Sequence, residues 1–218
     1  MNEKRLLGNK RLLISIGGGH ATGVDKVAKK LQKSILNMFN NAYVTIIDLD
    51  RKIEKLGYKR TYSNNDLDFD TIFTNIQNIK THDGIDVIIL CGCYALYDSK
   101  LNNLSKLKIF LDSDNDKRLI NLIEKNHIAT PQQLSLVITE YMDNLRPEMT
   151  KYIEPTRSVA DMIIPYENES VGSEILLDGV VKAIQEIDDG HNKIHTVPIW
   201  NYESEEMDVQ KERYYDLS

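Results

Sequence analysis

The feature that most constrains the fold of this chain is an apolar run, Leu12–Ile16, that leads into the glycine-rich segment Gly17–Gly23 and then into a helical pattern starting at Val24. Four residues separate Gly18 from Gly23, which is the glycine spacing of a phosphate-binding loop. Glycines are needed there because consecutive backbone N–H groups must curl around a phosphate at the N-terminus of a helix. The order of strand, glycine-rich turn and helix therefore predicts an α/β fold with a ligand site at this turn.

The residues after this turn differ from those that phosphate chemistry requires. A P-loop places a lysine on the β- and γ-phosphates and then a Ser or Thr on Mg²⁺, but this chain has Val24 and Asp25 at those positions. Because a carboxylate can itself bind Mg²⁺, Asp25 is the candidate metal ligand. Lys26 follows, but helix geometry rotates it by about 200° from Val24, which predicts a side chain that points away from the loop. The candidate nucleotide-binding residues are Gly18, Gly19, His20, Ala21, Thr22, Gly23, Val24 and Asp25.

Strand-like and helical segments alternate along the chain. The continuous apolar runs typical of buried parallel strands are Leu12–Ile16, Tyr43–Ile47, Asp86–Cys91, Lys108–Leu111 and Met162–Ile164. The helical patterns are Val24–Phe39, Asp70–Ile79, Asp116–Glu124, Pro131–Asn144 and Gly172–Glu186. This alternation predicts a three-layer α/β fold, with a parallel five-stranded sheet and helices on both faces. The polar segment Glu54–Asp68 is expected to be a surface excursion beside the site.

Composition limits the function classes that need to be considered. A chain of 218 residues that is 41% hydrophobic can form one substantial domain, which we place at residues 1–187, and residues 188–218 are expected to be a partly flexible tail. A formal net charge of −6 argues against nucleic-acid and membrane partners. Without a secretory or membrane-spanning segment in the sequence, we expect a cytoplasmic protein, with the nucleus as a further location. We expect Cys91 and Cys93 to face opposite sides of the sheet and to form no disulfide, and the scattered His and Cys predict no structural metal.

The second half of the chain carries an ordered series of motifs. They are KIFLDSDNDKRL at residues 108–119, ITEY at 138–141, RPE at 146–148 and EPTRSVADMIIP at 154–165. This series resembles the uridine-cytidine kinase branch of the P-loop nucleoside kinases, in which the corresponding segments read close to FVDTDxDxRL, TxY, KP and PTxxxADxIIP. The resemblance covers roughly residues 12–187. It implies a P-loop kinase-like fold and a phosphotransferase of pyrimidine salvage that uses ATP and Mg²⁺ to convert uridine or cytidine into UMP or CMP.

The same resemblance implies roles for three further residues. Asp50 corresponds to the presumed base for the nucleoside hydroxyl, so it is the candidate catalytic and substrate-binding residue. Arg118 and Glu140 are further candidates for binding substrate, although Glu140 stands where the family has glutamine. The acidic residue that the family has after its third strand corresponds here to Cys91, which we expect to be a buried small hydrophobic residue.

Two segments of the family are shortened in this chain. The hairpin that holds the nucleoside is reduced to residues 78–84, and the arginine-rich lid is reduced to residues 120–131, in which Lys125 is the cation that remains. Loss of one preorganised electrostatic donor typically lowers a rate by about 10²–10³. Loss of the loop lysine together with the lid arginines therefore predicts weak or no kinase activity.

Three hypotheses follow from these departures. The leading one is a degenerate uridine-kinase-like protein that binds a nucleotide or nucleoside and has a regulatory role, as a homo-oligomer or as a heteromer with an active kinase paralogue. The second is an active kinase that recruits Asp25 for Mg²⁺ and obtains positive charge from Lys26, Lys125 or an arginine of a partner. The third is a non-catalytic scaffold that binds another protein.

Overall fold

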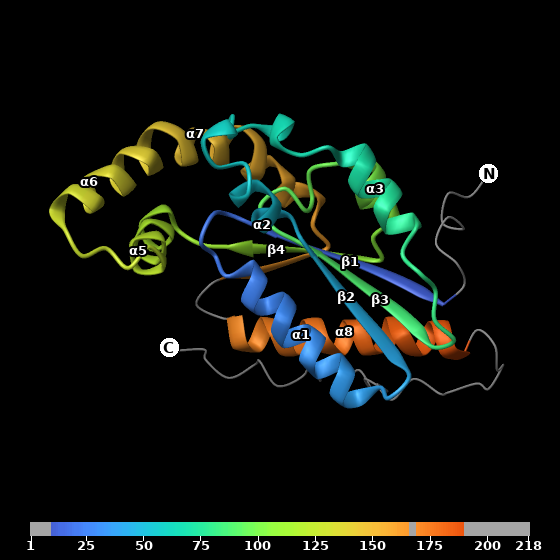
Figure 1. The fold of residues 1–218 in the computed structure, drawn as a ribbon. Helices are drawn as coiled ribbons and strands as arrows, with labels where there is room; N and C mark the ends of the chain where they lie inside the picture. The colour runs from blue at the N-terminus through green and yellow to red at the C-terminus, as the bar shows by residue number, and fades with distance from the viewer. Residues whose placement is uncertain (1–9, 166–168, 190–218) are drawn as a thin grey trace, which may run out of the picture.

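The computed structural model describes residues 10–165 and 169–189, and its centre is a five-stranded sheet (Figure 1). The strands are β1 (Arg11–Gly18), β2 (Ala42–Asp48), β3 (Ile85–Cys91), β4 (Leu107–Asp112) and β5 (Met162–Pro165). Their order is β2-β3-β1-β4-β5, and every neighbouring pair is parallel. The predicted parallel five-stranded sheet is confirmed, with each strand at its expected place in the sequence.

Helices cover both faces of this sheet. On one face lie α1 (Val24–Met38) and α8 (Glu169–Asp189), which pack on Leu12, Ile14 and Ile16 of β1. The other face is covered by α2 (Leu49–Glu54), α3 (Phe69–Gln77) and α4 (Ser99–Leu104), whose core also includes Leu13. Because successive side chains of a strand point to opposite faces, β1 supplies both cores and fixes the three-layer arrangement.

The two cysteines lie on opposite faces of the sheet. Cys91, at the end of β3, belongs to the core beneath α1 and α8, whereas Cys93 belongs to the core on the opposite face. Both are buried and both are free thiols. They face opposite sides, as expected, but because β3 ends at Cys91 and the chain turns at Gly92, whose φ is 131°. Within one strand, residues two apart would share a face. Cys91 is the buried small side chain that the sequence predicted.

The segment after β4 departs furthest from the expected helices. The helix α5 (Asn115–Lys125) is followed by α6 (Pro131–Glu140), and these two helices project from the sheet as an arm (Figure 1). The chain then continues through segments of different helix type. They are the π-helical turns η4 (Tyr141–Leu145) and η5 (Met149–Ile153), the short α7 (Arg146–Glu148) between them, and the 3₁₀ helix η6 (Glu154–Val159). The single helix predicted over 131–144 is therefore part of a longer, irregular path, because Pro147 and Pro155 cannot donate the backbone hydrogen bonds of a regular helix.

Several segments are shorter or longer than the patterns suggested. Residues 54–68 contain two single-turn helices, η2 (Gly57–Lys59) and η3 (Asn64–Asp66). Residues 78–84 join α3 to β3 without a strand or helix of their own. The helix α8 runs two residues past the predicted boundary at 187, to Asp189, and the rest of the predicted tail lies outside the described residues. Within the described ranges, each helix is too short or too polar to cross a membrane.

Candidate functional site

The glycine-rich loop joins β1 to α1 and is closed by its own threonine. The backbone N–H and the side-chain hydroxyl of Thr22 both donate to the carbonyl of Gly19, at N···O 3.3 Å and Oγ1···O 2.8 Å. Gly23 has a φ of 83°, which is the left-handed region that favours glycine. A Cβ on Gly18 would lie 2.8 Å from Thr22 Oγ1 and 2.9 Å from the carbonyl oxygen of Leu111, so the closed loop requires glycine at this position.

A cavity of about 710 Å³ opens beside this loop, at the carboxyl ends of the strands. It lies between the loop, α1, the end of β2, α2 and the second half of α5 with the turn that follows it. Its lining residues are Ala21, Thr22, Gly23, Val24, Asp25, Lys26, Lys29, Asp48, Asp50, Arg51, Glu54, Asn121, Glu124, Lys125 and His127. Five of the eight predicted nucleotide-binding residues therefore line one cavity, which they share with the candidate base Asp50.

The charges of the cavity nearly balance. Five carboxylates and four cationic side chains line it, and two of the cations are already paired. Lys29 Nζ lies 2.9 Å from Asp25 Oδ2, and Lys125 Nζ lies 2.7 Å from Glu54 Oε1. Burial favours the neutral form of Asp25, but the hydrogen bond and the charge of Lys29 outweigh it and lower the pKa of that carboxyl. The hydrogen bond to Glu54 raises the pKa of Lys125.

The side chain of Lys26 points in a different direction from the one predicted. Its side chain lines the cavity, and its Cδ would lie 3.7 Å from a Cβ at Gly23. The expectation that it points away was wrong because a helical side chain leans toward the N-terminus, and Gly23 leaves room there for a long lysine. Lys26 and Arg51 form no ion pair within the described residues. Sequence reasoning missed Arg51 and His127, since only the fold brings α2 and the α5–α6 turn to the loop.

Asp50 lies at the start of α2, at the bottom of the cavity. Its Oδ1 accepts a hydrogen bond from the backbone N–H of Cys93 at 2.7 Å, and its Oδ2 lies 3.6 Å from Cys93 Sγ. Burial raises the pKa of this carboxyl, and the hydrogen bond from Cys93 and the nearby His20 compensate only in part. Asp50 is therefore anchored to the backbone after β3 and still reaches the cavity.

The raised pKa of Asp50 predicts a pH-dependent effect of Asp50→Asn. The neutral acid is favoured in the folded state, so its stabilising contribution is complete below the unfolded pKa of about 3.9 and is lost as pH rises through the folded pKa. We expect Asp50→Asn, which cannot ionise, to gain stability relative to the native chain as pH rises from about 4.5 to 7.5. The gain is about 1.4 kcal/mol for each unit by which the pKa is raised.

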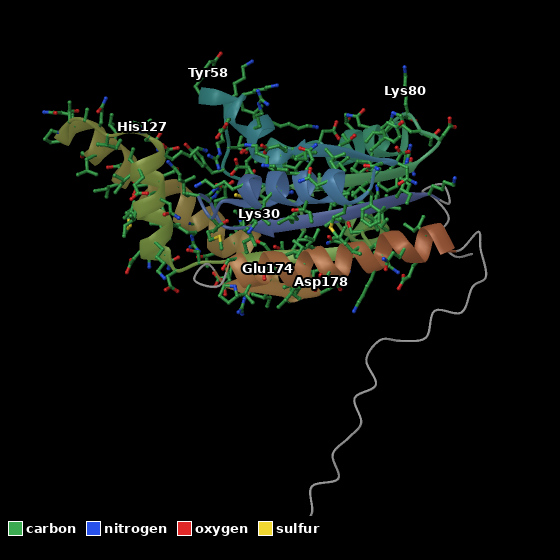
Figure 2. All side chains as sticks on the ribbon, turned by 90° about the horizontal axis from the view of Figure 1, so that it is seen from below. Lys30, Tyr58, Lys80, His127, Glu174 and Asp178 are labelled. Carbon is green, nitrogen blue, oxygen red and sulfur yellow. The ribbon has the colours of Figure 1, made fainter. Side chains whose placement is uncertain are left out.

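Urea unfolding across this pH range measures that effect. Asp178→Asn is the matched control because Asp178 is an exposed carboxylate on α8 (Figure 2). A stability difference between Asp50→Asn and the native chain that does not change with pH would contradict the prediction.

His20, one of the predicted nucleotide-binding residues, belongs to a largely buried polar cluster and does not line the cavity. Its Nδ1 lies 3.2 Å from Cys93 Sγ, and its Nε2 lies 3.0 Å from Glu148 Oε2, within ion-pair distance but poorly aligned for a hydrogen bond. The carboxylate of Glu148 is fully buried and also accepts from Arg60 Nη2 at 2.7 Å and from the hydroxyl of Tyr94 at 2.8 Å. The contact with Glu148, which comes from a distant segment, holds the imidazole in this cluster.

The two further substrate candidates lie outside the cavity lining. Arg118 is buried, its Nη1 donates to the carbonyl of Ser113 at 2.6 Å, and its side chain covers Gly19. Glu140 is exposed at the end of α6 and accepts a hydrogen bond from the hydroxyl of Tyr62 at 3.0 Å. Both side chains hold neighbouring segments in place in this structure.

The residues present fit a nucleoside triphosphate with Mg²⁺ only in part. The first turn of α1 directs backbone N–H groups toward the cavity, which favours an anion. However, the N–H of Thr22 is used within the loop, and the side chain of Val24 is buried in the core with Val27 and Leu31. Within residues 10–165 and 169–189, no group of three His, Cys, Asp or Glu side chains is arranged to hold a metal ion. We therefore derive no phosphoryl-transfer step from these residues.

The sequence of this chain is similar to those of known kinases. Residues 31–171 match the family described as "Phosphoribulokinase / Uridine kinase family". A Saccharomyces cerevisiae protein named "Putative uridine kinase DAS2" is 48% identical over 233 residues, which cover 99% of this chain and 100% of that protein. The uridine kinase of Lactococcus lactis subsp. lactis is 30% identical over 208 residues, which cover 82% of this chain and 98% of that enzyme.

One solved structure supports the fold. It is a crystal structure from Silicibacter sp. TM1040, titled as a "putative fructose transport system kinase", with a TM-score of 0.50 and 13% sequence identity. The match covers 72% of this chain and 90% of that one. The P-loop kinase-like fold predicted from the sequence is confirmed, and at this identity the likeness concerns the fold alone.

Proposed function

The chain belongs to the phosphoribulokinase and uridine kinase family, and from this premise we propose that it is a uridine-kinase-like nucleotide-binding protein with weak or no kinase activity. The observation that supports the proposal most directly is the charge of the cavity. A catalyst of phosphoryl transfer surrounds the transferred group with positive charge, whereas this cavity contains more carboxylates than cationic side chains. Its role would lie beside pyrimidine salvage, as a regulator that responds to a nucleotide.

The closed loop supports the same proposal. Thr22 occupies the carbonyl of Gly19 with two hydrogen bonds, and Asp25 places a carboxylate in the first turn of α1. A negative side chain there stabilises the empty helix by about 0.3–1 kcal/mol and opposes an incoming phosphate. A nucleotide would therefore bind more weakly here than in a loop that carries lysine and serine.

A second candidate function is that of an active uridine or cytidine kinase. The observation that favours it is the position of Lys26, which faces the cavity without an ion pair in the described residues, together with Arg51 and Lys125 on the opposite wall. These side chains could supply positive charge in place of the missing loop lysine. Asp50 would then be the base for the nucleoside hydroxyl, and Asp25 a ligand of Mg²⁺.

One experiment separates these functions. The thermal stability of the purified chain is measured against ATP, GTP, uridine and cytidine, with and without Mg²⁺, and UMP and CMP are assayed in the same samples. A ligand at 100 times its dissociation constant adds about 2.7 kcal/mol of stability. Stabilisation without turnover is the result that we expect. Turnover abolished by Asp50→Asn would establish the active kinase, and neither stabilisation nor turnover would leave a non-catalytic scaffold.

Asp25→Asn is expected to tighten ATP binding in the absence of Mg²⁺ by about tenfold. The substitution removes one negative charge from the phosphate side of the cavity and releases Lys29 from its ion pair. One charge about 6 Å from a phosphate, at an effective dielectric constant of about 40, is worth about 1.4 kcal/mol. Isothermal titration calorimetry measures this change.

The same titration with Mg²⁺ tests the metal role of Asp25. If Asp25 binds Mg²⁺, Asp25→Asn weakens ATP binding when Mg²⁺ is present and the gain disappears. Asp178→Asn, on the exposed face of α8, is the control for a change in total charge. Equal effects of the two variants would contradict a local role of Asp25.

A further inference from the structure

One edge of the sheet is open in the described residues. β2 pairs only with β3, and its other side faces a groove of about 400 Å³. The groove is lined by Thr45, Ile46, Ile47, Asp48, Arg51, Lys52, Lys55, Asn75 and Ile79. It therefore lies along four consecutive residues of the edge strand, between α2 and the end of α3 (Figure 1).

The backbone of β2 can accept another strand. The carbonyl of Asn41 accepts from the N–H of Ile85, so residues 41, 43, 45 and 47 direct their backbone groups toward β3. The backbone groups of Val44 and Ile46 then point away from β3, and the carbonyl of Val44 accepts a hydrogen bond from Gln32 Nε2 at 3.0 Å. The N–H and C=O of Ile46 remain open to the groove.

The sequence of β2 lacks the usual protection of an edge. Natural edge strands are commonly guarded by lysine, proline or a bulge, because an open edge pairs with other chains. From Ala42 to Ile47 this strand contains no charged residue and no proline, and it is rich in β-branched residues. Such an edge is stable in a soluble protein when a segment of polypeptide covers it.

The positive charge of the groove favours an acidic segment as its occupant. Arg51 and Lys52 of α2 and Lys55, the residue after it, line the groove, are exposed, and form no ion pair within the described part of the chain. The one carboxylate of the lining, that of Asp48, accepts from the backbone N–H of Arg51 at 3.0 Å. Three cationic side chains beside an open strand edge fit an extended segment with several carboxylates.

This chain contains such a segment. Residues 203–209, outside the described part, read ESEEMDV and carry four acidic residues and no basic one. Thirteen residues separate Glu203 from Asp189, the end of α8, and they can span about 43 Å. This reach exceeds the width of a five-stranded sheet, which is about 19 Å.

We propose that residues 203–209 bind along the open edge of β2 as a sixth strand, with their carboxylates next to Arg51, Lys52 and Lys55. The occupant comes from the same chain. Because Asp48 and Arg51 line both the groove and the large cavity, the bound segment lies next to the candidate site. The proposal concerns the sheet edge and does not depend on whether a nucleotide binds.

Zero-length carbodiimide cross-linking of the full chain, followed by mass spectrometry, tests the proposal. We expect amide cross-links from Lys52 and Lys55 to the acidic residues of 203–208, reduced at least tenfold in Glu205→Lys/Glu206→Lys, which leaves both lysines and the carboxyls of Glu203 and Asp208 able to react. Adding Lys52→Glu/Lys55→Glu to that variant reverses both charges and should restore cross-links between the groove and the segment. Lys30→Glu/Lys33→Glu, on the exposed face of α1, is the matched control and should leave them unchanged (Figure 2).

Hydrogen exchange provides a second readout that needs no substitution in the groove. The amide of Ile46 should exchange at least tenfold more slowly in the full chain than in a chain ending at Asn201. Equal exchange in the two chains, or cross-links to Lys30 and Lys33 as abundant as those to Lys52 and Lys55, would overturn the proposal. Cross-links found only between isotopically distinct copies would also overturn it and would assign the groove to a second copy.

Discussion

Glu148→Ala is expected to lower the free energy of unfolding by about 3 kcal/mol or more. The carboxylate of Glu148 is fully buried and binds Arg60, Tyr94 and His20, which belong to three separate segments. Removing one partner of a buried ion pair typically costs about 3–5 kcal/mol, because the other charge is left without compensation. Arg60 retains some access to water, at 18% side-chain exposure, so we place the loss at the lower end of this range.

Urea unfolding at neutral pH measures this loss. Glu148→Gln keeps the size of the side chain and one acceptor oxygen but removes its charge and the second acceptor, so it should have an intermediate effect. Glu174→Ala, which changes an exposed carboxylate on α8, should stay within about 0.5 kcal/mol of the native chain (Figure 2). A loss below about 1 kcal/mol for Glu148→Ala would show that the cluster does not hold these segments together.

Lys26→Glu is expected to weaken the binding of a nucleoside triphosphate by about a hundredfold. Lys26 faces the cavity from the first turn of α1 and has no ion pair in the described residues, so its charge is available to a phosphate. The substitution changes the local charge by two units. About 6 Å from a phosphate, at an effective dielectric constant of about 40, this change amounts to about 2.8 kcal/mol.

Calorimetric titration of ATP, with the stability of each variant measured in parallel, tests this prediction. Lys33→Glu makes the same change of charge on the same helix, but Lys33 is exposed and does not line the cavity. We expect it to alter the affinity less than threefold at physiological ionic strength, where screening acts over about 8 Å. Similar losses for both variants would assign the effect to the overall charge of the protein and not to the cavity.

The positions of the helices were less predictable than those of the strands. The run Asp86–Cys91 is apolar at nearly every position, so a buried parallel strand was the natural interpretation. The short helices α2 and α4 carry few apolar residues and start at the aspartate caps Asp48 and Asp98, whose side chains accept from Arg51 N and Leu101 N. A helix of six residues gives too short a pattern to be recognised from periodicity.

The candidate site was predictable only in the part that is continuous in the sequence. The loop and Asp25 were identified from spacing, and Asp50 from the family resemblance, and all of them lie at one cavity apart from Gly18, Gly19 and His20. The local sequence did not indicate which side chains of other segments enter the site. Arg60 and Glu148 are 88 residues apart, and nothing in their local sequence indicates that they meet.

The sequence by itself determined the family, the parallel sheet and the loss of the loop lysine, because apolar period, glycine spacing and motif order are local properties of the chain. The tertiary structure decided the charges around the loop. It places Lys26, Arg51 and Lys125 on one cavity with Asp25 and Glu54, and it buries Glu148 between Arg60 and His20. Electrostatic energy depends on distance and burial, and only the fold fixes either of these for residues that lie far apart in the sequence.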